Sequence, residues 1–302
     1  MNKMQRQKLT CITKNAEFDY SMAGYTTFQA GGKVEALCRV ETLVELQELI
    51  AFLGKEKIPY LPVGHGSNLV VRDGGYRGVA VVLAGNLARI GKWTESNGTV
   101  AVGAGLSIAR LLAYCRNKGL GGLEFLAGVP GTVGGAIFGN AGAWGKDIGS
   151  KVAKIQLVLS NGKVAVKDRE ELSFSYRSLS LPEGSVIVKG WLELDRNSEE
   201  KIRARIEHYL KQRKTRQPLE YPSGGSVFKN PPNQHAAKLI EAAGLKGKKV
   251  GGAMISPKHA NFIVNTGGAK ASDIIALMEL AREQVKQQTG IELEPEIKLV
   301  GT

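Results

Sequence analysis

An uncharged, glycine-rich stretch in the middle of the chain restricts the fold more than any other feature of the sequence. Residues 125–145 contain no charged side chain and seven glycines. The stretch is long enough to span a bilayer, and Gly131, Gly135 and Gly139 have the spacing of a membrane-dimer motif. However, so many small residues leave too few bulky apolar groups for lipid, and no second span accompanies them. We therefore predict no membrane insertion and interpret the stretch as buried loop backbone wrapped around a ligand.

The composition is that of a folded, basic protein. The 302 residues are 43% apolar and 23% charged, which predicts two or three domains with hydrophobic cores. The net charge of +13 is spread along the chain and aromatic residues make up only 6%. Because nucleic-acid binders concentrate their basic residues and use aromatic stacking, that class is a remote alternative. A diffuse positive field suits small anionic ligands such as nucleotides.

Cysteine, histidine and the start of the chain exclude several other classes. The three cysteines and four histidines form no CxxC, HxxxH or HExxH pattern, so we predict no metal site and no disulfide framework. The polar start of the chain has no apolar segment of the secretory type, which predicts a cytoplasmic protein.

Hydrophobic periodicity predicts mixed helices and strands. A capping box at Thr42 and Glu45 begins a helix that ends at Gly54, and Asn161-Gly162 predicts a hairpin. Further strands are expected at 35–40, 60–63, 69–71, 79–83, 88–94, 99–102, 155–159, 163–167, 185–194, 261–264 and 297–300. Further helices are expected at 107–118, 198–215, 234–243 and 272–289.

Two glycine-rich loops are the first candidate binding elements. One is PVGHGSNLVV, residues 62–71, between two apolar strands; the other is AGVPGTVGGAIFGNAGAWG, residues 127–145. Neither has the Rossmann or the P-loop pattern, and each taken alone could be a tight structural turn. Together on one strand-rich body they favour a dinucleotide, because its pyrophosphate and planar ring need close backbone approach.

Three further segments carry reactive side chains. Ser226 follows Gly-Gly in GGSVFKNP, which predicts an exposed, mobile hydroxyl that can exchange a proton. Arg177 lies beside aromatic residues in FSYRS, and Glu296 follows Pro295 between apolar residues. A turn serine, a surface arginine and a solvated glutamate remain the alternatives for each residue by itself.

The order of these segments resembles the UDP-N-acetylenolpyruvoylglucosamine reductase family. The resemblance includes GSNLVV, GVPGTVGGAIFGNAGAWG, YRSL, GGSVFKNP, LIEAAGLKG and KHANFIVN, and it extends over nearly the whole chain. It implies an α+β protein with the FAD-binding fold of the vanillyl-alcohol oxidase type, in two α+β lobes, plus a C-terminal α+β substrate domain. The expected division is an N-terminal tail (1–20), lobe 1 (21–90), lobe 2 (91–197) and the substrate-binding domain (198–302). No tyrosine-bearing insertion precedes the Ser226 loop, so the chain resembles the shorter branch of the family.

The resemblance also implies the roles of individual residues. Ser226 becomes the proton donor, with Arg177 and Glu296 as the other catalytic residues, and Lys229, Asn230 and His259 are expected to bind substrate. The residues expected to hold FAD are Gly64, His65, Gly66, Ser67, Asn68, Gly128, Pro130, Gly131, Thr132, Gly134, Gly135, Asn140 and Ala141.

The reaction implied by the resemblance is the NADPH-dependent reduction of UDP-N-acetylglucosamine enolpyruvate to UDP-N-acetylmuramate through non-covalent FAD. It belongs to peptidoglycan precursor synthesis and hence to cell wall biogenesis, cell shape and cell division. The expected partners are the UDP-sugar and NADPH, with a monomeric protein. The alternative is a sugar or alcohol oxidase of the same fold. In related flavin folds a histidine can link covalently to the ring methyl group, so a link through His65 is a remote alternative to non-covalent FAD.

Overall fold

The computed structural model describes residues 1–302, except for the side chain of Asn97. The chain forms two compact units. The first unit consists of Met1–Phe18, Ala36–Gly64 and Gly78–Lys211, and the second of Asp19–Glu35, His65–Arg77 and Gln212–Thr302. The expected division at residues 20, 90 and 197 stays a prediction.

Helices begin where the sequence supplies capping side chains. The Thr42 hydroxyl accepts a hydrogen bond from the N–H of Glu45, and the Glu45 carboxylate accepts one from the N–H of Glu41. Gly119 ends another helix in the left-handed conformation that favours glycine. The helices are α1 (Lys3–Ile12), α2 (Leu43–Lys55), α3 (Ile108–Lys118), α4 (Val133–Phe138), α5 (Glu199–Arg216), α6 (Ala236–Ala242) and α7 (Ala271–Thr289).

The strands form one five-stranded sheet, two four-stranded sheets and several two-stranded pairs. Their orders are β12-β11-β15-β7-β6, β1-β2-β5-β3, β17-β20-β19-β18, β9-β10, β13-β14, β8-β16 and β4-β21. The strands are β1 (Ala16–Ser21), β2 (Lys33–Val40), β3 (Tyr60–Pro62), β4 (Leu69–Val71), β5 (Tyr76–Leu83), β6 (Ile90–Thr94), β7 (Thr99–Gly103), β8 (Leu120–Gly121), β9 (Gly142–Ala143), β10 (Lys146–Asp147), β11 (Val152–Val158), β12 (Val164–Asp168), β13 (Ser173–Ser175), β14 (Ser178–Ser180), β15 (Val186–Glu193), β16 (Asp195–Arg196), β17 (Ser223–Ser226), β18 (Lys249–Val250), β19 (Ala253–Ile255), β20 (Phe262–Asn265) and β21 (Lys298–Val300).

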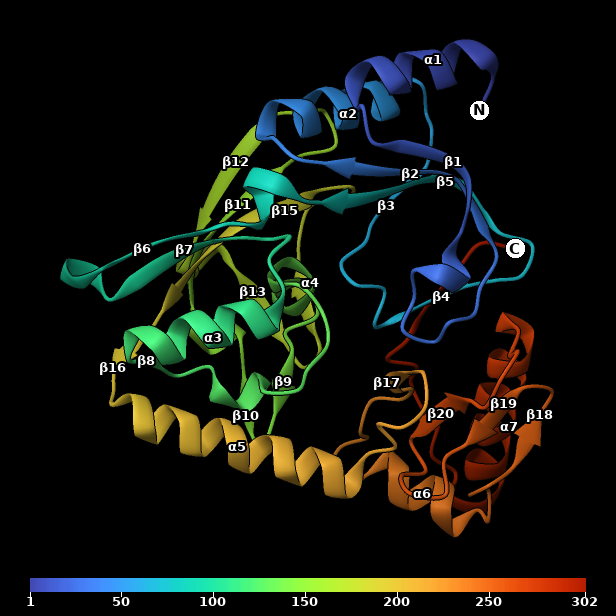
Figure 1. The fold of residues 1–302 in the computed structure, drawn as a ribbon. Helices are drawn as coiled ribbons and strands as arrows, with labels where there is room; N and C mark the ends of the chain where they lie inside the picture. Colours follow the sequence, from blue (N-terminus) through green and yellow to red (C-terminus); the bar gives the residue numbers. More distant parts are fainter. The chain divides into compact units, whose positions relative to one another are not determined.

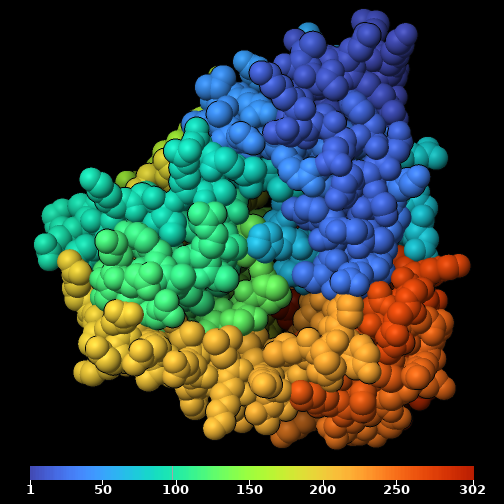
Figure 2. Space-filling view, viewed as in Figure 1, coloured from blue at the N-terminus to red at the C-terminus, as the bar shows by residue number. Residues whose placement is uncertain are grey.

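The five-stranded sheet of the first unit is covered on both faces. Along β15, Val186 and Val188 join the core that contains α2, whereas Ile187 joins the core that contains α3 and α4. This alternation follows from the two-residue period of a strand. In Figure 1, α3 and α4 lie on one side of this sheet. In Figure 2 the tip of the β6–β7 hairpin, coloured cyan, projects from the surface.

The second unit is built on the antiparallel sheet β17-β20-β19-β18. The long helix α7 packs on β18 and β19, and its buried residues join the same core as Phe28, Phe228 and Ile297. The carboxylate of Asp73 accepts hydrogen bonds from the N–H groups of Ala271 and Ser272, which begin α7. A distant loop residue therefore caps this helix.

The expected elements are present, with ends shifted by a few residues, and two helices, α1 and α4, were not predicted. The segment expected to be an N-terminal tail contains α1 and β1. Within residues 125–145, expected to be buried loop, α4 forms a short helix, and the side chains of Phe138 and Trp144 are exposed. No helix of the described residues combines the length and apolar composition that crossing a membrane requires.

Candidate functional site

The two glycine-rich loops meet at Gly64 and Thr132 in the first unit. A Cβ added to Gly64 would lie 2.6 Å from the Thr132 hydroxyl oxygen, so only glycine fits there. Thr132 is buried and caps α4, because its hydroxyl accepts a hydrogen bond from the N–H of Gly135 at 3.3 Å. The close approach of the two backbones fixes where the second loop begins.

The second loop presents unpaired backbone donors. Gly128 has φ +75° and Gly131 has φ +141°, a conformation that turns successive N–H groups away from regular pairing. In the described chain the N–H groups of Gly128, Gly131 and Thr132 donate to no acceptor, although Thr132 is buried. An unpaired donor at a buried position is costly, so the N–H of Thr132 fits a ligand with acceptor oxygens or ring nitrogens, and the N–H groups of the exposed Gly128 and the half-buried Gly131 are further donors in the same loop. The predicted cofactor residue Pro130 lies in the same loop, whereas Gly134 lies in the first turn of α4, where its N–H donates to the backbone oxygen of Ala104.

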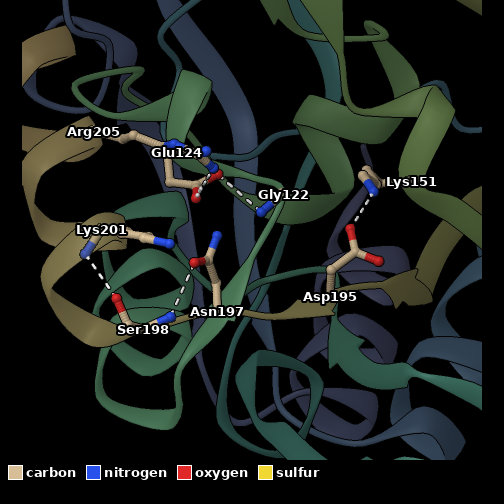
Figure 3. Close-up of polar contacts among 8 residues, drawn as sticks. All are labelled: Gly122, Glu124, Lys151, Asp195, Asn197, Ser198, Lys201 and Arg205. Carbon is tan, nitrogen blue, oxygen red and sulfur yellow. Dashed lines mark hydrogen bonds and ion pairs between the residues drawn. The ribbon is translucent and has the colours of Figure 1, made fainter.

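A buried glutamate just before the second loop, Glu124, was not among the predicted site residues. Glu124 is only 5% exposed and lies in a single turn of 3-10 helix, Glu124–Leu126, just before the loop. Its carboxylate accepts a hydrogen bond from the N–H of Gly122 at 2.8 Å and lies 3.4 Å from the guanidinium of Arg205 on α5 (Figure 3). No signal in the sequence indicated this burial, because a carboxylate between Leu123 and Phe125 can equally face solvent; once buried, it needs such partners.

The first loop continues into the second unit with His65, Gly66, Ser67 and Asn68. His65 and Asn68 are exposed, and Gly66 has φ +62° with its backbone packed on Thr26. Within the described residues, the backbone N–H groups of His65, Gly66 and Asn68 donate to no acceptor. This part of the loop can therefore donate several hydrogen bonds to one anion.

Asn68 also connects the first loop to Glu296, near the end of the chain. Its side-chain nitrogen donates to the backbone oxygen of Glu296 at 3.0 Å, and the N–H of Lys298 donates to the Asn68 oxygen at 3.1 Å. The parallel pair β4-β21 continues this contact. Two predicted site segments that are far apart in the sequence are thus neighbours in the second unit.

Ser226 lies next to the same segment. It ends β17, pairs with Phe262 and is half-buried, so it is less exposed than expected. A Cβ on Gly224 would lie 2.2 Å from the Phe28 ring, and Gly225 has φ +79°, so both glycines are required for the bulge that turns Ser226. The N–H of Glu296 donates to the oxygen of Val227 at 2.9 Å, which holds Ser226 and Glu296 on adjoining segments.

Two of the three predicted substrate residues, Lys229 and Asn230, are bonded to other residues of the second unit. The Lys229 ammonium lies 2.5 Å from the Glu294 carboxylate, and the Asn230 side-chain oxygen accepts a hydrogen bond from the N–H of Ala236 at 3.1 Å. The His259 ring packs edge-on against Phe262, and its buried Nδ1 has no partner among the described residues. Burial, together with the charge of Lys246, lowers the pKa of His259, so its ring is neutral near pH 7.

Arg177 lies in the first unit, at the turn of the β13–β14 hairpin. Its guanidinium packs over the Tyr176 ring at 5.1 Å and against the backbone of Gly142. Asn140 and Ala141, predicted to bind the cofactor, immediately precede Gly142, and the side chain of Asn140 is buried and bonded within the protein. The structure therefore groups Ser226 with Glu296 in one unit, and Arg177 with the second glycine-rich loop in the other.

The fold belongs to the class of FAD-binding proteins. The family model of the FAD binding domain matches residues 34–166. Fold likeness extends to an alkyldihydroxyacetonephosphate synthase, with TM-score 0.51 and 13% identity, covering 65% of this chain and 41% of that chain. It also extends to a berberine bridge enzyme variant, with TM-score 0.50 and 18% identity over 66% of this chain and 44% of the other. The expected FAD-binding fold is thereby confirmed.

The chain belongs to the UDP-N-acetylenolpyruvoylglucosamine reductase family. The C-terminal domain model of that family matches residues 217–300. The reductase of Syntrophus aciditrophicus is 41% identical over 99% of this chain and 96% of its own length. The reductase of Alkalilimnicola ehrlichii is 44% identical over 93% of both. The crystal structure of the Thermus caldophilus reductase has TM-score 0.80 and 36% identity, covering 95% of this chain and 98% of that chain.

Proposed function

We propose that this protein reduces UDP-N-acetylglucosamine enolpyruvate to UDP-N-acetylmuramate, with NADPH as the hydride source and non-covalent FAD. The observation that carries the proposal is the identity of about two residues in five with such reductases over nearly the whole chain. The same proposal includes a role in peptidoglycan precursor synthesis, a cytoplasmic location and a monomeric state.

The residues present fit FAD. The unpaired N–H groups of His65, Gly66 and Asn68 suit an anion such as the pyrophosphate, and those of Gly128, Gly131 and Thr132 suit acceptor atoms of a planar ring. The contact between Gly64 and Thr132 holds the beginnings of the two loops together in the first unit. Bound FAD would accept a hydride from NADPH and pass it to the enolpyruvyl double bond.

The role we assign to Arg177 is electrostatic. Hydride addition to the methylene carbon leaves negative charge on the neighbouring carbon, and this charge spreads into the attached carboxylate. A guanidinium offers a planar pair of N–H donors to such a carboxylate and lowers the energy of the charged state. Glu296 would support the same charge as a protonated or hydrogen-bonding carboxyl group.

The role we assign to Ser226 is that of proton donor. A serine hydroxyl is a very weak acid toward water, but a carbanion is basic enough to remove its proton. The half-buried position of Ser226 limits competition from bulk water, which is consistent with this role. The next residue, Val227, accepts a hydrogen bond from the N–H of Glu296, and this bond fixes the backbone beside Ser226.

Lys229 is proposed to bind the nucleotide diphosphate. In the structure its ammonium group is paired with Glu294, whose side chain is 68% exposed. Exposed ion pairs contribute little, about 0–1 kcal/mol, so a doubly charged diphosphate can replace Glu294 without a large penalty.

The test of the proposed function separates the two half-reactions by following flavin absorbance in a stopped-flow spectrometer. Ser226→Ala is expected to keep the wild-type rate of flavin reduction by NADPH. Oxidation of the reduced flavin by the enolpyruvyl nucleotide should slow by ~10²–10⁴-fold, the usual loss for a general acid. Ser223→Ala in the same strand is the matched control and should leave both rates unchanged. An alanine variant that oxidises at the wild-type rate would show that Ser226 is not the proton donor.

A further inference from the structure

The hairpin that carries Arg177 is too small to hold its own conformation. Ser175 pairs with Ser178, so Tyr176 and Arg177 alone form the turn between two strands of three residues each. Arg177 has φ +59°, and the left-handed region costs a non-glycine residue about 1–2 kcal/mol. An isolated two-stranded hairpin is marginal in water, so contacts from outside must fix this turn.

Asn140 supplies that contact. Its side-chain nitrogen donates to the backbone oxygen of Ser175 at 2.9 Å, directly before the turn. Its side-chain oxygen accepts from the backbone N–H of Gly149 at 2.9 Å. The side chain is 95% buried, since only 5% of the residue is exposed, so neither bond is replaced by water without loss.

The Asn140 amide is closely packed by its neighbours. A Cβ added to Gly149 would lie 2.7 Å from the Phe174 ring and 2.8 Å from the Asn140 oxygen. Two residues after Asn140, the backbone of Gly142 lies against the Arg177 guanidinium, whose Nη1 is 3.0 Å from the Cβ position of Gly142. The segment that carries Asn140 therefore contacts the hairpin twice: Asn140 bonds the backbone of Ser175 before the turn, and Gly142 lies against the Arg177 side chain.

We propose that Asn140 is a positioning residue for Arg177: its amide locks the β13–β14 turn so that the guanidinium is held ready for the substrate carboxylate. This inference rests on the proposed role of Arg177. Only a side chain with one donor and one acceptor at this length makes both bonds. Aspartate has the same shape, but when ionised it has no proton for the Ser175 oxygen.

Two variants test the inference, and the half-reactions are measured separately for each. A misplacement of about 1 Å costs about 10²-fold, so Asn140→Ala should slow flavin oxidation by the enolpyruvyl nucleotide by about that factor. Flavin reduction by NADPH should be unchanged, because the Asn140 side chain is bonded to Ser175 and Gly149, and a contact of its backbone with FAD would survive the substitution. Asn140→Asp should be slow at pH 8 and recover as the pH falls, because the protonated carboxyl group regains a donor. Asn161→Ala is the control, since Asn161 also bonds a backbone N–H in a hairpin turn of the same unit.

The Arg177→Ala background separates the inference from the proposed function. If Asn140 acts through Arg177, then Asn140→Ala should add no further loss to Arg177→Ala. A single Arg177→Ala variant with the wild-type rate would refute the role of Arg177 itself. If the Arg177→Ala variant is slow but the separate Asn140→Asp variant is fast at pH 8, only the positioning role is overturned. Equal slowing of both half-reactions with a lower Tm would also overturn it, because that result marks a purely structural residue.

Discussion

The contact between Gly64 and Thr132 makes the substitution Gly64→Ala a sharp test of the glycine-rich site. The added methyl would lie 2.6 Å from the Thr132 hydroxyl oxygen, roughly 0.9 Å inside the ~3.5 Å at which non-bonded atoms are comfortable. Thr132 cannot move freely, because it is buried and caps α4. Overpacking and the lost cap together should destabilise the protein by about 2–4 kcal/mol.

The assay is thermal unfolding together with FAD affinity. The Tm should fall by roughly 5–15 °C, and FAD should bind more weakly because the second loop is displaced. Gly24→Ala is the matched control, since no atom lies within 4 Å of the added methyl there. In a Thr132→Ala background the clash is gone, so the cost of Gly64→Ala should shrink. If the two changes add independently, or if Gly64→Ala leaves the Tm and FAD affinity unaltered, the argument that the two loops are fitted to each other is refuted.

Three further outcomes are expected. Although burial raises it, hydrogen bonds from Ser272 and Ala271 lower the pKa of Asp73 in the folded protein. The stabilisation by Asp73 is therefore present above its unfolded-state pKa and is lost as the pH falls through its folded-state pKa. Asp73→Ala should lower the free energy of unfolding, measured in urea, by about 1 kcal/mol at pH 7 and by much less at acid pH. An equal loss at both pH values would contradict this. Lys229→Ala should raise KM for the nucleotide and flatten its dependence on salt, as loss of a charge contact requires, and a salt dependence equal to wild type would refute the assignment. Acid precipitation should release the flavin to the supernatant, whereas colour that stays with the pellet would indicate a covalent link through His65.

Local signals predicted much of the fold. The Thr42–Glu45 cap and the Asn161-Gly162 turn act over three or four residues, and both form as expected. The helix α4 was missed because two of its six residues, Gly134 and Gly135, are glycine, which has a low helix propensity. It forms because Thr132 caps it and Val133 and Ile137 are buried in the core of the first unit.

The candidate site was predictable only where its residues are close in sequence. The glycine-rich loops were identified from their own composition. The bond between Asn140 and Ser175 joins residues 35 apart, and the bond between Asn68 and Glu296 joins residues 228 apart. The spacing of apolar residues along the chain cannot predict such contacts, because they depend on how the sheets bring separate loops together. The partner of Glu124 on α5 escaped prediction for the same reason.

The central claim is that electrons from NADPH go to the enolpyruvyl nucleotide. The most direct measurement is to reduce the flavin of the purified protein with one equivalent of NADPH in the absence of oxygen, and then to add UDP-N-acetylglucosamine enolpyruvate. We expect the oxidised flavin spectrum to return, with one equivalent of UDP-N-acetylmuramate formed. A flavin that stays reduced until oxygen is admitted would contradict the claim and would identify the protein as an oxidase.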